Sequence, residues 1–175
     1  MEPPLTPRVR LLAVLAVLAA CGRPAEHRPG EPPSPLSVDE AKLAAVATVH
    51  GGAGPWAVAG YRMGEYALAR LGAKRGSFDL EVTHFTPREV QYSCIADGAA
   101  AATGASLGKL NLVLADAAPS ETRTVYHRRS TGQVLVLRLT KSFKARFLDV
   151  PRDHLGDAGR QVLRLGDDEI FEVGP

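Results

Sequence analysis

Two side chains far apart in the sequence could carry chemistry, a histidine and a cysteine. Cys94 lies near the start of the alanine-rich run SCIADGAAAATGASLGKLNL, three residues before Asp97. His50 ends the segment ATVH, directly before GGAGPW. An imidazole nitrogen and a thiolate sulfur are good zinc ligands, and the same pair can serve as base and nucleophile. His50, Cys94 and Asp97 therefore form the first candidate site.

Each of these residues also has a structural explanation. Free cysteine is often buried as a small apolar side chain, whereas a Cys94 at a helix N-terminus would have its pKa lowered by the helix dipole. His50 falls on the inward face of a helix, where a buried, hydrogen-bonded histidine is common. Asp97 suits the capping of a first helical turn. The residue types alone leave these alternatives open.

The N-terminus predicts how the other cysteine is used. MEPPLTPRVR is basic, and LLAVLAVLAA is too short to span a bilayer, which predicts a secretory signal peptide over residues 1–20. The sequence Leu18-Ala19-Ala20-Cys21 resembles a bacterial lipobox, so we expect Cys21 to be lipidated and to anchor the chain in a membrane. An ordinary signal cut after an Ala-x-Ala-like site is the alternative. Glycine rather than aspartate at position 22 favours the outer membrane, facing the periplasm. With Cys21 acylated, Cys94 has no disulfide partner within the chain.

Composition limits the remaining function classes. Residues 21–36 are rich in proline and predict a linker, and residues 37–175 are long enough for one domain. A net charge of +2 and 6% aromatic residues argue against a nucleic-acid partner.

The hydrophobic periodicity predicts helices followed by strands. The sequence SVDE at residues 37–40 is typical of a capping box, and glycines 60 and 64 indicate close helix packing. His84 shares the apolar face of a strand, which favours the core over a ligand role. This order of elements predicts an α+β fold, with N-terminal helices on a mixed or antiparallel sheet and a C-terminal meander. The expected helices are 37–50, 55–71, 94–102 and 152–164, and the expected strands are 77–85, 110–115, 122–129, 133–140 and 169–173.

Two longer motifs resemble those of the FmdE family, which takes its name from a component of formylmethanofuran dehydrogenase. They read HGGAGPWAVAGYRMGE from His50 and SCIADGAAAATGASLGKLN from Ser93, and a hairpin-like RRSTGQVLVL follows in the same order. The resemblance implies an α+β domain, often paired as a homodimer, in which a histidine and a cysteine meet in a pocket that binds a metal such as zinc. By position, His50 and Cys94 match that polar site. The family's other signature positions, which the resemblance makes candidates for ligand binding, are Asp97, Thr103, Lys109 and Asn111.

The chain departs from the family pattern at several ligand positions. Glycine stands at position 52 in place of a second histidine, glycine at 54 and alanine at 105 in place of cysteines, and the tail has no Cys-x-x-Cys pair. His50 and Cys94 alone make a weak site for a divalent ion unless His84 or a second copy of the chain contributes. Thr103-Gly104 and Gly108-Lys109 could hold an anion through their backbone amides, but a simple turn explains them equally well.

Three functions are therefore open. The first is a membrane-anchored domain that binds a metal ion or small ligand through His50, Cys94 and Asp97, or a degenerate member that keeps only the pocket. The second is a metal- or thiol-dependent enzyme with Cys94 as nucleophile and His50 as base. The third is a structural, partner-binding lipoprotein. Formylmethanofuran dehydrogenase activity itself is not expected, because other components of that enzyme carry its redox chemistry. We expect the histidines at 27, 127 and 154, which have no motif around them, to lie in solvent.

Overall fold

The structure, a computed structural model, describes residues 35–174. The predicted signal peptide, Cys21 and the linker up to residue 34 lie outside the described residues. None of the helices within 35–174 is long and apolar enough to cross a membrane.

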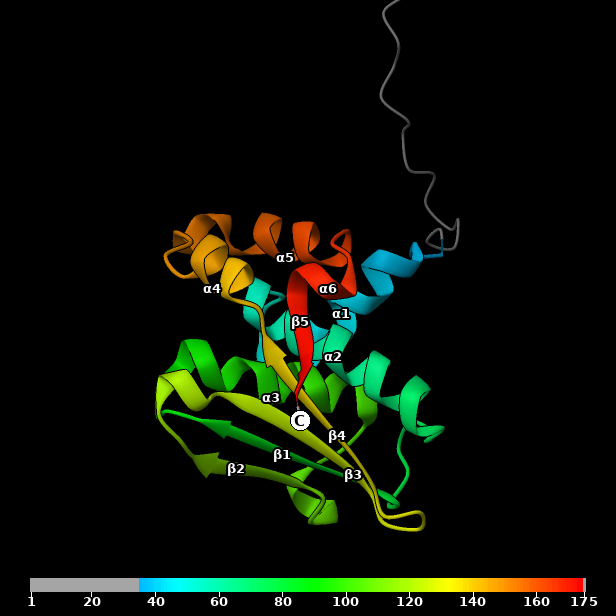
Figure 1. Cartoon of the computed structure of the whole chain (residues 1–175). Helices are drawn as coiled ribbons and strands as arrows, with labels where there is room; N and C mark the ends of the chain where they lie inside the picture. Colours follow the sequence, from blue (N-terminus) through cyan, green and yellow to red (C-terminus); the bar gives the residue numbers. More distant parts are fainter. Residues whose placement is uncertain (1–34, 175) are drawn as a thin grey trace, which may run out of the picture. The chain divides into compact units, whose positions relative to one another are not determined.

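A five-stranded mixed sheet forms the base of the fold, in the order β2-β1-β3-β4-β5 (Figure 1). β2 runs parallel to β1, and the other neighbouring strands are antiparallel. The predicted α+β fold is confirmed. The strands are β1 (Leu80–Thr86), β2 (Leu112–Asp116), β3 (Arg123–Arg128), β4 (Gln133–Leu139) and β5 (Phe171–Gly174).

Helices cover one face of this sheet (Figure 1). α3 lies next to the strands, and α2 lies between α3 and α5 (Figure 1). α1 packs mainly against α3, and α4 contacts α6. The helices are α1 (Val38–His50), α2 (Pro55–Leu71), α3 (Val90–Thr103), α4 (Lys141–Phe147), α5 (Leu155–Leu163) and α6 (Asp167–Ile170).

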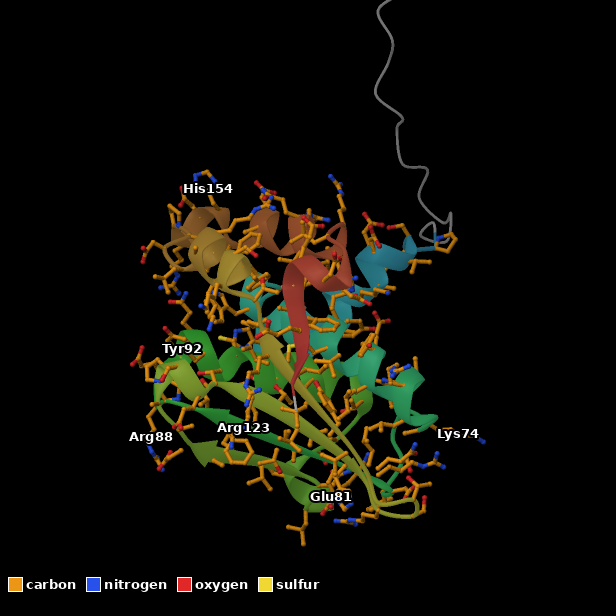
Figure 2. All side chains as sticks on the ribbon, viewed as in Figure 1. Lys74, Glu81, Arg88, Tyr92, Arg123 and His154 are labelled. Atoms are coloured by element: carbon orange, nitrogen blue, oxygen red, sulfur yellow. The ribbon has the colours of Figure 1, made fainter. Side chains whose placement is uncertain are left out.

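Alternation along β1 fixes which strand face meets the helices. Leu80, Val82 and His84 are buried, while the side chains between them are half-exposed on the other face. Phe78 lies before the strand and is exposed, and the predicted start at residue 77 was three residues early. Figure 2 shows Glu81 and Arg123 among the polar side chains over the sheet.

The capping box predicted at the start of α1 is confirmed. The Ser37 hydroxyl accepts from the Glu40 backbone amide at 3.2 Å, and the Glu40 carboxylate accepts from the Ser37 amide at 3.0 Å. Gly51 adopts a left-handed conformation, with φ of 86°, and ends the helix. His50 is thereby held at the last position of α1.

Some predicted elements were wrong in their bounds, and one helix was not predicted. α3 begins at Val90, four residues before the predicted start. The sequence did not reveal this start because no side chain caps the N-terminus of α3. α4 was not predicted. It starts where Thr140 accepts from the Phe143 amide at 3.0 Å. Of the strand predicted over 169–173, the first two residues belong to α6.

α2 and α3 touch backbone to backbone, as glycine in α2 predicted. A Cβ at Gly60 would lie 2.1 Å from the Ile95 carbonyl oxygen, and a Cβ at Gly98 would lie 1.8 Å from the Ala57 carbonyl oxygen. No real side chain tolerates such distances. Each helix therefore needs glycine where it meets the other.

We expect Gly98→Ala to destabilise the domain by about 3 kcal/mol or more, because the new methyl group forces α2 and α3 apart. On helix propensity alone, the same change should stabilise by about 1 kcal/mol. Urea unfolding followed by circular dichroism measures the difference. Gly156→Ala is the matched control: no atom lies within 4 Å of its Cβ position in α5. Equal stability of the two variants would contradict the close contact.

Candidate functional site

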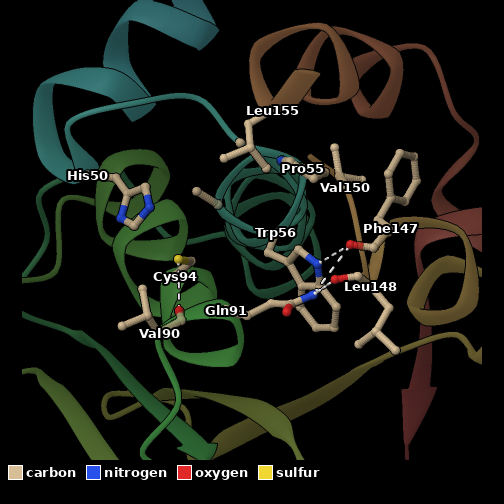
Figure 3. A pocket seen from close by; sticks show the side chains of 12 residues that line it. His50, Pro55, Trp56, Val90, Gln91, Cys94, Phe147, Leu148, Val150 and Leu155 are labelled. Carbon is tan, nitrogen blue, oxygen red and sulfur yellow. Dashed lines mark hydrogen bonds between the residues drawn. The ribbon is translucent and has the colours of Figure 1, made fainter. Parts of the chain in front are cut away.

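A cavity of about 300 Å³ lies where α1, α2, α3 and the α4–α5 segment meet (Figure 3). Its wall is mostly apolar, and its polar side chains are His50, Gln91 and Cys94. The cavity therefore joins two of the residues that the sequence singled out. The remaining lining residues are Gly54, Pro55, Trp56, Ala57, Val90, Phe147, Leu148, Val150 and Leu155.

A carboxylate fixes the histidine at one end of the cavity. The Nδ1–H of His50 donates to Oδ2 of Asp97 at 2.8 Å, across 47 residues of sequence. The His50 side chain is 24% exposed and that of Asp97 46%. Among the described residues, Nε2 of His50 has no hydrogen-bond partner. In the neutral ring this nitrogen carries a lone pair, so it can accept a hydrogen bond or bind a metal.

Cys94 lies beside His50 but is held as a thiol. Its sulfur donates to the Val90 carbonyl at 2.9 Å (Figure 3). Burial, and then the nearby Asp97 carboxylate, raise the pKa of the Cys94 thiol to about 11. The prediction of a lowered pKa at a helix N-terminus is therefore wrong: α3 begins at Val90, which leaves Cys94 in the second turn.

The far end of the cavity is closed by hydrogen bonds to the end of α4. The Trp56 indole donates to the Phe147 carbonyl at 2.8 Å, and the Gln91 amide nitrogen donates to the Leu148 carbonyl at 2.6 Å (Figure 3). Gln91 also reaches the Phe147 carbonyl at 3.4 Å. Free carbonyls at the end of the short α4 helix are satisfied in this way. The C-terminal part of the chain is thus fastened onto α2 and α3.

A model of the family described as "FmdE, Molybdenum formylmethanofuran dehydrogenase operon" matches residues 49–172. The chain belongs to the FmdE family. A search among curated proteins found no match. The matched residues include every segment that lines the cavity, so the cavity is a feature of the FmdE domain itself.

The other FmdE signature positions lie outside the cavity, at the C-terminal end of α3. Lys109 donates to the Gly104 carbonyl at 2.6 Å. Asn111 donates to the Leu80 carbonyl at 2.8 Å, and the Thr103 hydroxyl donates within α3 at 2.7 Å. Because these polar atoms bond to backbone groups, the cluster secures the turn between α3 and β2. The geometry favours the turn alternative over an anion site.

His84 is a core residue. It is fully buried, with Nδ1 2.9 Å from the Thr124 hydroxyl and Nε2 donating to the Tyr92 carbonyl at 3.1 Å. Burial lowers the pKa of His84 to about 4. Both ring nitrogens are engaged, so His84 supplies no ligand to the cavity.

The remaining histidines also lie away from the cavity. His127 donates to Glu81 at 2.7 Å and its side chain is 38% exposed. His154 is 65% exposed. The histidine at position 27 lies outside the described residues.

The side chains of residues 35–174 in one copy of the chain do not fit a resident metal. Among residues 35–174, no group of three or more His, Cys, Asp or Glu side chains is placed to hold an ion. Asp97 is used by His50, and Cys94 keeps its proton. A structural zinc site needs four ligands and a catalytic one three.

Sequence reasoning missed the far wall of the cavity. Trp56 is the only tryptophan of the chain and follows the proline of the first motif, which was a usable signal. Gln91, Phe147 and Leu148 carry no motif. Their part in the cavity comes from contacts across more than fifty residues.

We expect Cys94 to be alkylated slowly at neutral pH. A pKa of about 11 leaves roughly one thiolate in ten thousand at pH 7, and the rate should rise with pH towards that pKa. Iodoacetamide labelling of a Cys21→Ser protein, followed by mass spectrometry, measures it. Asp97→Asn should speed labelling, because it removes one cause of the raised pKa, whereas Asp39→Asn on exposed α1 should not. Labelling of the native protein as fast as a free thiol would contradict the buried, protonated state.

Proposed function

We propose that this FmdE domain binds a small organic molecule in the cavity between His50, Cys94 and Trp56. The observation that carries the proposal is a cavity of about 300 Å³ with an apolar wall and one histidine fixed by a carboxylate. Ligand sites are usually concave, mostly apolar and about 300–1,000 Å³, with a few placed polar groups. This cavity lies at the lower end of that range.

The family motifs support the same site. The first motif supplies His50 and Trp56, and the second supplies Cys94 and Asp97. These residues come from three helices, yet His50, Trp56 and Cys94 line one cavity and Asp97 bonds to His50. A purely structural role would not require the two motifs to meet at a hollow.

The state of Cys94 favours binding over thiol chemistry. A cysteine nucleophile acts as a thiolate, activated by a base or by a lowered pKa. The pKa of Cys94 is raised, and its proton is directed to the Val90 carbonyl rather than to His50. The arrangement suits a wall residue of a binding pocket.

Zinc is the second candidate occupant, because a histidine held through Nδ1 by a carboxylate is the arrangement that metal-ligating histidines use. The further ligands would have to come from a second copy of the chain or from outside residues 35–174. A degenerate member that keeps the pocket but not the metal is consistent with the glycines at positions 52 and 54.

Methyl benzoate, an uncharged aromatic probe, tests the pocket. We expect saturable binding in the millimolar range, read from the fluorescence of the sole tryptophan, Trp56. Val90→Phe should weaken binding at least fivefold, because Val90 lines the cavity and is 78% exposed, so a larger ring fills the entrance without disturbing the core.

Val38→Phe is the matched control. Val38 is also the first residue of a helix and is 73% exposed, but it does not line the cavity. Equal effects of the two variants, or no saturable binding to the native protein, would contradict the proposal and leave a partner-binding scaffold. Zinc is titrated in parallel by calorimetry. Stoichiometric zinc binding that His50→Ala abolishes would favour a metal site instead.

We also propose that Cys21 anchors the domain to the cell envelope through a lipid, with the domain in the periplasm at the outer membrane. The signal-like residues 1–20 and the lipobox-like Leu18-Ala19-Ala20-Cys21 support this proposal. A single lipid chain gives only reversible membrane binding, so more than one acyl group is expected on Cys21.

Mass spectrometry of the mature protein, expressed in a bacterium with an outer membrane, tests the anchor. We expect an N-terminus at Cys21 with acyl groups attached, and partition into a detergent phase. Cys21→Ser should move the protein to the soluble fraction. A mature N-terminus elsewhere, without lipid, would contradict the anchor and favour an ordinary signal peptide.

A further inference from the structure

The cavity wall offers a ligand no charged partner. Its lining contains no lysine, arginine, aspartate or glutamate from the described residues. Asp97 does not line the cavity, and its carboxylate is engaged by Nδ1 of His50. An ion buried in this cavity would lose hydration without gaining a counter-charge, which is costly.

The side-chain donors of the wall are already engaged. The Cys94 thiol donates to Val90, the Trp56 indole donates to Phe147, and the Gln91 amide nitrogen donates to the carbonyls at the end of α4. Among the described residues, these donors reach backbone oxygens rather than the open cavity. A ligand therefore finds no free side-chain donor in this part of the chain.

The free side-chain group at the His50 end is an acceptor. His50 lines the cavity, whereas Asp97, which holds its Nδ1, does not, so the ring edge towards the cavity carries Nε2. A carboxylate can only accept hydrogen bonds, so the bond with Asp97 places the proton of the neutral His50 ring on Nδ1 and leaves the lone pair on Nε2. The position of this acceptor is fixed from two sides, by the end of α1 and by the carboxylate on α3.

We propose that the cavity takes an uncharged, largely apolar molecule of about ten non-hydrogen atoms that presents an N–H or O–H donor to Nε2 of His50. The size follows from the volume, since about 300 Å³ corresponds to roughly ten water molecules at liquid density. This inference rests on the proposed function and narrows its ligand class.

The first turn of α2 allows a second polar group on the same ligand. No side chain caps this helix, and the described structure gives the Trp56 and Ala57 amides no partner, although both residues are buried. A carbonyl on the ligand could accept from them. An amide, which has both a donor and an acceptor, satisfies both groups without a charge.

Four aromatic probes of similar size separate uncharged ligands with a donor from uncharged ligands without one and from ions. Benzamide is uncharged with a donor, methyl benzoate is uncharged without one, benzoate is an anion and benzylamine a cation. Each is titrated at mildly alkaline pH against Trp56 fluorescence. We expect benzamide to bind about three- to tenfold more tightly than methyl benzoate, the usual effect of one hydrogen bond, and the two ions to bind more weakly than either.

Two variants test whether the preference for benzamide arises at His50. His50→Phe keeps a ring but removes Nε2, so benzamide and methyl benzoate should then bind equally. Asp97→Asn keeps an acceptor for Nδ1 and removes the negative charge, so the preference for benzamide should survive and benzoate should bind more tightly. Unchanged melting and circular dichroism identify variants that still fold.

The outcomes distinguish this inference from the proposed function. Equal binding of all four probes, or tightest binding by either ion, would overturn the donor preference while leaving a ligand pocket. A benzamide preference that persists in His50→Phe would also overturn it. Failure of every probe to bind would overturn the proposed function itself.

Discussion

The backbone contact between α2 and α3 is the constraint on which the site depends. Gly60 and Gly98 allow the two helices to touch, and nothing larger fits at either position. Gly98 directly follows Asp97, so the same contact places the first turns of α3 against the start of α2. Trp56 and Cys94 can then share one cavity. A side chain at Gly98 would clash with the backbone of α2 and force the two helices apart at this contact.

Two long-range links complete the enclosure that this contact begins. The bond from His50 to Asp97 ties the end of α1 to α3, and it closes one side of the cavity. The bonds from Trp56 and Gln91 to the carbonyls at Phe147 and Leu148 close the other. The second pair of bonds satisfies carbonyls at a helix end, where backbone hydrogen bonding stops. The cavity is thus assembled from helix termini rather than from the sheet.

Local patterns in the sequence were enough to predict most elements but not the enclosure. The alternation in β1, the capping box at Ser37 and the glycines of α2 each act over a few residues, so periodicity reveals them. The start of α3 was misplaced because Glu89 provides no cap hydrogen bond. No sequence pattern predicted the wall formed by Phe147 and Leu148, because its contacts join segments that are far apart in the sequence. The family resemblance also could not separate the cavity residues from Lys109 and its neighbours, which secure a turn.

The protonation and hydrogen bonding of the cavity's polar groups favour binding of a molecule over a reaction with it. In a site that reacts through a nucleophile, the nucleophile lies close to a base and readily loses its proton. Here the thiol of Cys94 is bonded to its own helix, and the raised pKa of that thiol opposes ionisation. The carboxylate of Asp97 is turned to His50, where it sets the position of the ring and the location of its proton. In the function that we propose, the fixed Nε2 acceptor of His50 recognises a ligand by the hydrogen that the ligand donates, and neither partner changes chemically.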